Sequence, residues 1–154
     1  HGFDINPFAV NISEMNLLFQ VIDLYSRAVK ENPSFTVPRF RVYETDSLEL
    51  PTEQTSLARF YGATGKSLAK DKEAVDELKR KKYDFVVGNP PYVRIQQMSS
   101  AIRKEYSESY ETTQGNYDIY VPFIELGIKL LNNRGKFGYI CSNQFFKRDY
   151  GRKL

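Results

Sequence analysis

The sequence contains a single histidine, His1, and a single cysteine, Cys141, in 154 residues. Histidine-based catalytic triads and zinc sites built from cysteine and histidine can therefore be set aside. A lone cysteine also excludes a disulfide within the chain and fits a reducing cytoplasm. No apolar run approaches the roughly 20 residues of a membrane span, and no signal peptide is visible.

A phosphate-binding P-loop is lacking as well. Gly65-Lys66-Ser67 has the ending of such a loop, but the motif requires a glycine five residues before Gly65, and the chain has Phe60 there. No strand is predicted before this segment. Nucleotide hydrolysis of the P-loop kind is therefore not expected.

What remains is the composition of an ordinary globular domain. Hydrophobic residues make up 41% and charged residues 27% of the chain, with a net charge of +3. At this length the chain can bury a core. Composition therefore predicts one globular domain or part of one.

The apolar pattern predicts alternating strands and helices. Asn6 as N-cap and Pro7 at the first helical position open a long helix that residues 31–33 end. Further strands are expected at 40–43, 83–87 and 136–142, and further helices at 70–82, near 101–106 after a Ser99 or Ser100 cap, and from an Asp118 cap to a stop at 133–135. Strands separated by helices predict an α/β fold, a mostly parallel sheet with helices on both faces.

The most informative motif is an Asn-Pro-Pro-Tyr turn. Residues 83–87 predict a short buried strand, so Asn89 follows at its carboxyl end, where open α/β sheets bind ligands. Pro90 and Pro91 fix the turn, the Asn89 amide and a proline carbonyl offer acceptors for an NH2 group, and Tyr92 offers a ring to stack on a planar base. Holding both N–H bonds would localise the lone pair of the amine for attack on a methyl donor, by electrostatic preorganisation. The alternative is a proline-rich turn capped by an exposed tyrosine.

This turn and its flanking segments resemble S-adenosylmethionine-dependent adenine-N6 DNA methyltransferases of the restriction-modification type, with fused nuclease and methylase. The resemblance covers nearly the whole chain in family order, through segments 2–7, 44–48, 89–92, 115–125 and 135–146. It implies a Rossmann-like fold, S-adenosylmethionine as cofactor, double-stranded DNA as partner and a bacterial or archaeal cytoplasm.

The resemblance also implies cofactor-binding residues. Asp4 matches the acid that binds the ribose hydroxyls, and Ile5 matches the residue against the cofactor adenine. Asp46, beside Ser47 in the next motif, matches the acid that accepts a hydrogen bond from the adenine amine. Phe123 matches the residue that packs on the adenine. Taken alone, Asp4 also suits an exposed turn, Asp46 a helix cap and Phe123 a core position.

The implied reaction is methylation of an adenine flipped out of the duplex. Flipping costs a few kcal/mol, and stacking on Tyr92 would offset roughly 1–3 kcal/mol of that cost. Asn89 and the carbonyl of Pro90 would accept hydrogen bonds from the amine. Pro91 completes the catalytic motif.

Basic residues suggest where DNA is contacted. Arg94 and Gln96, just beyond the turn, are candidates for the target or its flanking phosphates, and Lys147 and Arg148 follow the last strand on the same side. The run at 79–82 is better explained as a solvated helix end, because cations favour helix C-termini.

The resemblance further implies that residues 1–154 are part of a catalytic domain. The family's first strand and glycine-rich loop, and any target-recognition or nuclease domain, would belong to a longer parent chain. In the family's sheet the first strand lies between the second and the fourth, so a central gap is expected. The chain alone should then bind S-adenosylmethionine weakly or not at all and be inactive.

Two other functions remain open from the sequence. Enzymes that methylate a protein glutamine amide also resemble residues 89–92, because that amide poses the same chemical problem. The second alternative is a methylase-like module that binds DNA or a partner without catalysis. The segment at 142–146 and the helix around Phe123 favour the DNA enzyme over the first, and the intact motif argues against the second.

Overall fold

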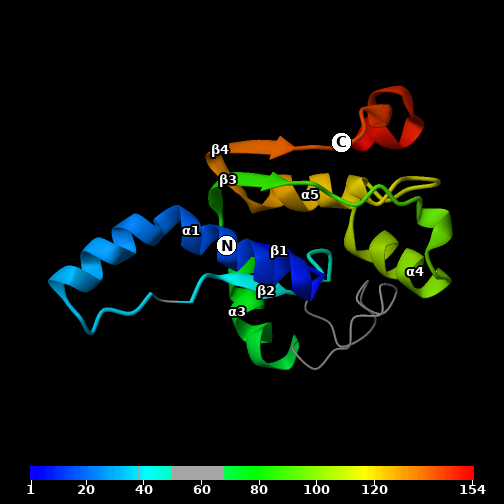
Figure 1. The fold of residues 1–154 in the computed structure, drawn as a ribbon. Helices are drawn as coiled ribbons and strands as arrows, with labels where there is room; N and C mark the ends of the chain where they lie inside the picture. Colours follow the sequence, from blue (N-terminus) through cyan, green and yellow to red (C-terminus); the bar gives the residue numbers. More distant parts are fainter. Residues whose placement is uncertain (38, 50–67) are drawn as a thin grey trace.

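The computed structural model describes residues 1–37, 39–49 and 68–154 (Figure 1). The Gly65-Lys66-Ser67 segment lies outside the described residues. The elements are β1 (Gly2–Asp4), α1 (Pro7–Glu31), β2 (Val42–Glu44), α3 (Leu68–Arg80), β3 (Tyr83–Gly88), η1 (Ile95–Gln97), α4 (Ser100–Ser109), α5 (Tyr120–Leu130), β4 (Leu131–Tyr139), η2 (Gln144–Lys147) and η3 (Asp149–Lys153). No helix in these ranges is long and apolar enough to cross a membrane.

The strands of the described residues form two separate parallel pairs. β1 pairs with β2 in the register Gly2 to Val42, and β3 pairs with β4 in the register Val86 to Phe137. Helix α1 contacts both strands of the first pair, and α5 contacts both strands of the second (Figure 1). The predicted α/β class with parallel strands is confirmed.

Helix α1 begins as predicted. The side chain of Asn6 accepts a hydrogen bond from the Phe8 N–H at 2.9 Å, and Pro7 occupies the first turn. Much of the apolar face is exposed, however, and Val10 is the buried residue of this helix. The exposed apolar residues of α1 include Phe8, Ile12, Met15, Leu18, Phe19 and Ile22. An apolar stripe of this length indicates a surface that another element can cover.

Two further helices follow the sequence pattern closely. Helix α3 lies two residues earlier than expected, and its predicted inner residues Val75 and Leu78 are buried. Helix α4 is capped by Ser99, whose hydroxyl accepts a hydrogen bond from the Ile102 N–H at 3.3 Å. Capping and apolar spacing thus located these helices correctly.

The boundaries of α5 and β4 correct the prediction. Asp118 does not cap α5, because its backbone forms an antiparallel bridge with Arg94, and Ile119 is the N-cap instead. The helix ends at Leu130 and passes directly into β4, so 133–135 is not its stop. Those residues lie within β4, where the pairing register with β3 shifts between Tyr83 and Phe85.

The other two strands also differ from expectation. β2 begins two residues later than predicted and ends one residue later, at Glu44. β3 is not a buried strand, since Phe85 is 73% and Val87 is 78% exposed. β3 pairs with β4 alone, and α5 packs on the pair, so the face that carries Phe85 and Val87 has no cover among the described residues. Cys141 was expected within a strand at 136–142, but it lies beyond the end of β4 and is half-buried.

The buried core lies around α4 and the start of α5. Its most deeply buried side chains include Tyr106 of α4 and Ile119, Tyr120 and Val121 at the beginning of α5. Leu48, from the turn after β2, is 1% exposed and belongs to the same cluster. The core therefore connects the first strand pair to the helices around the Asn-Pro-Pro-Tyr turn.

Candidate active site

A cavity of about 220 Å³ lies where three strands end. β1 ends at Asp4, β2 ends at Glu44 and β3 ends at Gly88, and ligands of open α/β sheets bind at such carboxyl ends. The lining residues are Phe3, Asp4, Ile5, Thr45, Asp46, Ser47, Asn89, Pro91 and Phe123. The structure thus brings together all the residues that the resemblance assigned to the cofactor, and Asn89 and Pro91 lie beside them.

Asp4 is held at the end of β1 by contacts of its backbone and side chain. Its carbonyl accepts a hydrogen bond from the Thr45 N–H at 2.9 Å, which extends the pairing with the neighbouring strand. Its carboxylate Oδ1 accepts from the Asn6 N–H at 2.8 Å. Because the side chain is exposed, the carboxylate can accept further hydrogen bonds from a ligand.

Asp46 is the buried carboxylate of the cavity. It is 2% exposed, and its Oδ1 accepts a hydrogen bond from the Leu48 N–H at 2.9 Å. Asp46 begins the turn formed by residues 46–49, and hydrogen bonds to the backbone carbonyls of this turn hold it in place. Lys79 Nζ donates to the Asp46 carbonyl at 3.0 Å and to the Glu49 carbonyl at 2.6 Å, and the Tyr110 hydroxyl donates to the Leu48 carbonyl at 2.9 Å.

Lys79 was wrongly interpreted from the sequence as part of a solvated helix end. Burial lowers the pKa of its ammonium group, and the negative charges of Asp46, Glu49 and Asp76 partly oppose this shift. The spacing contained a usable signal. Lys79 lies four residues after the buried Val75, and residues four apart share a helix face, so its stem follows the inner side of α3.

The 89–92 turn presents an amide and a ring beside the cavity. Pro90 is buried, while Asn89 is exposed, and its side chain forms no hydrogen bond within the described part of the chain. The Tyr92 hydroxyl donates to the Ile140 carbonyl at 2.9 Å, and the residue is 58% exposed. The ring is thus anchored through its hydroxyl and still open to a stacking partner.

A polar groove of about 400 Å³ lies beyond this turn. It gathers Arg94 and Gln96 from the exit of the turn, and Arg148 from the end of the chain. Its other lining residues are Gln114, Gly115, Asn116, Tyr117, Asp118, Gln144 and Tyr150. Lys147 lines an adjoining cavity that also includes Arg148. Three of the DNA-contact candidates therefore share one groove, and Arg148 connects it to the fourth.

Residues 1–154 match the family described as Eco57I restriction-modification methylase. The chain belongs to this family. Membership agrees with the resemblance inferred from the segments around the Asn-Pro-Pro-Tyr turn.

Among its relatives is the type II methyltransferase M.BstVI of Geobacillus stearothermophilus, 48% identical over 73 residues, or 47% of this chain and 13% of that protein. The adenine-specific methyltransferase PglX of Streptomyces coelicolor is 30% identical over 173 residues, with 100% of this chain and 14% of that protein covered. The type II restriction enzyme and methyltransferase RM.Eco57I of Escherichia coli is 37% identical over 81 residues, 51% of this chain and 8% of that protein. The chain thus spans only a small part of each of these relatives.

Proposed function

We propose that the protein containing this chain transfers a methyl group from S-adenosylmethionine to N6 of a flipped adenine in duplex DNA, within a restriction-modification system. The observation that carries the proposal is the single cavity that joins Asp4, Asp46 and Phe123 to Asn89. Membership of the Eco57I family supports it, and one relative, PglX, is named adenine-specific.

The residues of the cavity fit an adenosyl group. The Asp4 carboxylate would accept from the two ribose hydroxyls, and the buried Asp46 carboxylate from the adenine amine. Ile5 and Phe123 supply apolar surface against which the adenine would pack, and Ser47, next to Asp46, also lines the cavity. When bound, S-adenosylmethionine supplies an electrophilic methyl group.

The 89–92 turn would hold the target amine. Asn89 Oδ1 and the Pro90 carbonyl accept its two N–H bonds, which orients the nitrogen lone pair toward the methyl donor. The exposed ring of Tyr92 stacks on the flipped base, and Pro91 keeps the turn rigid. No proton acceptor of high basicity is required before methyl transfer, because the neutral amine is the nucleophile.

The polar groove would contact the DNA around the flipped base. Arg94 and Arg148 supply positive charge for phosphates, and Gln96 supplies an amide for a base edge or backbone. Lys147 extends the positive surface into the adjoining cavity. Positive charge close to the 89–92 turn would favour binding of the phosphates that flank a flipped nucleotide.

We further propose that residues 1–154 are part of the catalytic domain of a longer bacterial or archaeal protein, expected in the cytoplasm. A parallel strand, followed by a glycine-rich loop, would lie between β1 and β3. In support, β1 and β3 each pair on one side only in the described residues, and Phe85 and Val87 are exposed. The target-recognition domain, and any nuclease domain, would occupy other parts of that protein.

Mass spectrometry of digested DNA tests the proposed reaction. Duplex DNA of varied sequence is incubated with the full-length protein and S-adenosylmethionine, and N6-methyladenine is expected. A parallel incubation uses glutamine-containing protein substrates. Methylated glutamine without methylated adenine would contradict the proposal and favour the protein methyltransferase, while cofactor binding without any methylation would favour a binding module.

A further inference from the structure

We propose that Tyr110 is a positioning residue for cofactor binding, whose hydroxyl fixes the 46–49 turn and thereby the Asp46 carboxylate. This inference rests on the proposed function, because it takes Asp46 to bind the cofactor adenine. Tyr110 does not line the cavity itself. Its effect is transmitted through Leu48.

Tyr110 is connected to Asp46 through the backbone carbonyl and the backbone N–H of Leu48. The Tyr110 hydroxyl donates to the Leu48 carbonyl at 2.9 Å, across 62 positions of sequence. The Leu48 N–H donates to Asp46 Oδ1, also at 2.9 Å. Tyr110, Leu48 and Asp46 are 4%, 1% and 2% exposed, so water cannot readily replace either hydrogen bond. A shift of Leu48 would therefore move the carboxylate.

Tyr110 is suited to act as a fixed donor. Burial, together with the negative charges of Asp46, Glu125 and Glu105, raises the pKa of the Tyr110 hydroxyl above its ordinary value. The hydroxyl therefore remains protonated over the physiological range. Its backbone N–H donates to the Tyr106 carbonyl at 2.9 Å and so closes the last turn of α4.

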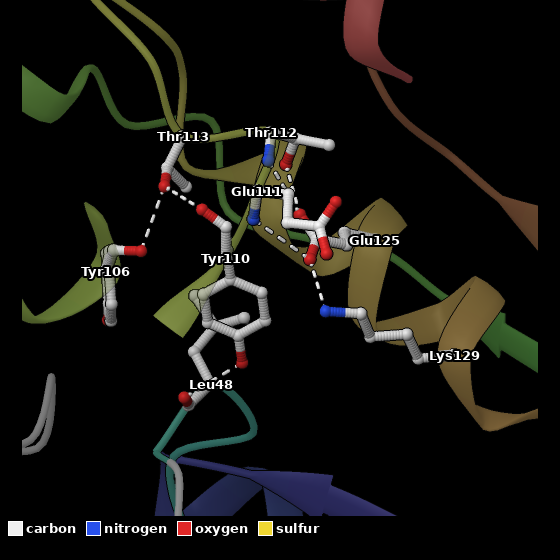
Figure 2. Close-up of polar contacts among 8 residues, drawn as sticks. All are labelled: Leu48, Tyr106, Tyr110, Glu111, Thr112, Thr113, Glu125 and Lys129. Atoms are coloured by element: carbon white, nitrogen blue, oxygen red, sulfur yellow. Dashed lines mark hydrogen bonds and ion pairs between the residues drawn. The ribbon is translucent and has the colours of Figure 1, made fainter. Parts of the chain in front are cut away.

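The segment that carries Tyr110 is anchored to α5 by a buried carboxylate (Figure 2). Glu125 is 8% exposed and accepts hydrogen bonds from the Glu111 N–H at 3.1 Å, from the Thr112 N–H at 2.9 Å and from the Thr112 hydroxyl at 2.7 Å. Lys129 Nζ lies 2.5 Å from the same carboxylate. Hydrogen bonds to a charged acceptor are among the stronger ones, so this anchor restrains the segment firmly.

Thr113 restrains Tyr110 from the other side. Its hydroxyl lies 2.6 Å from the Tyr110 carbonyl and 2.9 Å from the Tyr106 carbonyl (Figure 2). Helix α5 also carries Phe123, which lines the same cavity as Asp46. The network therefore links two elements that line the cavity.

Tyr106 provides a matched control one helical turn away. It is 2% exposed, and its ring packs edge-on against that of Tyr110, with centroids 6.3 Å apart. In the described part of the chain its hydroxyl has no hydrogen-bond partner. Tyr106→Phe and Tyr110→Phe thus remove the same atom from the same helix end, but only the second change leaves a buried carbonyl unsatisfied.

The test is calorimetric binding of S-adenosylhomocysteine to the full-length protein and its variants. Tyr110→Phe should weaken binding by about fivefold, the effect of one net hydrogen bond, while Tyr106→Phe should bind like the wild type. In methylation assays the KM for S-adenosylmethionine should rise with kcat nearly unchanged. Thr112→Val, which removes one hydrogen bond of the anchor, should show a smaller change in the same direction.

A cofactor analogue separates positioning from general stability. S-adenosylhomocysteine with purine in place of adenine lacks the amine that Asp46 would bind, so Tyr110→Phe should weaken its binding far less. A loss of equal size for both ligands, or no loss for either, would overturn the inference and leave the proposed function standing. If Tyr110→Phe fails to fold, the binding of S-adenosylhomocysteine and of its purine analogue is compared in Thr112→Val instead, and the same outcomes would overturn the inference. A folded wild type that binds no S-adenosylhomocysteine would refute the proposed function and this inference together.

Discussion

The hydroxyl of Tyr92 donates to the backbone carbonyl of Ile140 at 2.9 Å, which ties the 89–92 turn to the residue that follows β4. The pairing of β3 with β4 extends to Ile140 as well, because the Ile140 N–H donates to the Gly88 carbonyl at 3.0 Å. The turn is therefore fixed at its beginning by a ladder hydrogen bond and at its end by a side chain. A rigid turn is what a preorganised amine site requires.

Tyr92 should act through its ring more than through its hydroxyl. Tyr92→Phe keeps the stacking surface and loses only the contact to Ile140, so kcat/KM for DNA should fall by less than about tenfold. Tyr92→Ala removes the ring, and the loss of base stacking should lower kcat/KM by roughly ten- to a hundredfold. Steady-state methylation assays measure both. Equal losses for the two variants would argue against stacking.

Asp4 should contribute to cofactor binding and not to the methyl-transfer step. Asp4→Asn weakens the acceptor for the ribose hydroxyls, so the dissociation constant for S-adenosylmethionine should rise by about tenfold or more. Asp84→Asn, at the opposite end of the parallel strands, serves as the matched control. Tight cofactor binding by Asp4→Asn would contradict the assignment of Asp4 to the ribose.

The polar groove should contribute to the salt dependence of DNA binding. Arg94→Ala and Arg148→Ala should each reduce the slope of log K against log salt by about one, if each arginine neutralises one phosphate. Arg134→Ala, in the exposed part of β4 away from the groove, should leave the slope unchanged. Titrations at several salt concentrations measure the slopes, and identical slopes in all three variants would exclude the groove as a phosphate site.

Glu105 should make stability depend on pH. Burial, with the negative charges of Asp46 and Glu49, raises the pKa of Glu105 from 4.5 to about 7. A carboxyl whose pKa is higher in the folded state favours folding fully below its unfolded pKa, and this contribution is lost as pH rises through about 7. As the pH rises from 4.5 to about 7, the free energy of unfolding of the wild type should therefore decrease relative to that of Glu105→Gln.

Denaturant unfolding at a series of pH values measures this difference. Glu108→Gln is the control, because Glu108 is exposed and, within the described ranges, its carboxylate pairs with Lys104 at 3.8 Å and with no other residue. Its pH profile should parallel that of the wild type. A Glu105→Gln profile that also parallels the wild type would show that the Glu105 carboxyl titrates as in the unfolded chain.

Much of the site could be predicted from sequence features that span only a few residues. Asn6 and Ser99 cap helices as predicted, and Asn89 follows an apolar run that forms a strand, so the carboxyl end of β3 could be identified. These features depend on residues close together in sequence. The burial of β3 could not be inferred in the same way, because exposure of Phe85 depends on which elements cover the strand.

For contacts to distant backbone groups, the sequence can show that a side chain such as Lys79 faces inward, but not which carbonyl it meets. Lys79 donates to the carbonyl of Glu49, 30 positions away, and Tyr110 donates to that of Leu48, 62 positions away. A carbonyl acceptor is present in every residue, so sequence does not mark which one is used. Glu125 was also missed, because a carboxylate within an apolar helix gives no indication that backbone N–H groups of another segment satisfy it.

The most direct test of the account compares wild type with Asn89→Ala in the full-length protein, with N6-methyladenine measured by mass spectrometry. Asn11→Ala, at an exposed position of α1, is the matched control. Asn89→Ala should bind S-adenosylmethionine like the wild type and lose about a hundredfold or more in methylation rate, as expected when a preorganised acceptor is removed. Asn11→Ala should keep full activity. Undiminished adenine methylation by Asn89→Ala would contradict the central claim that Asn89 holds the target amine.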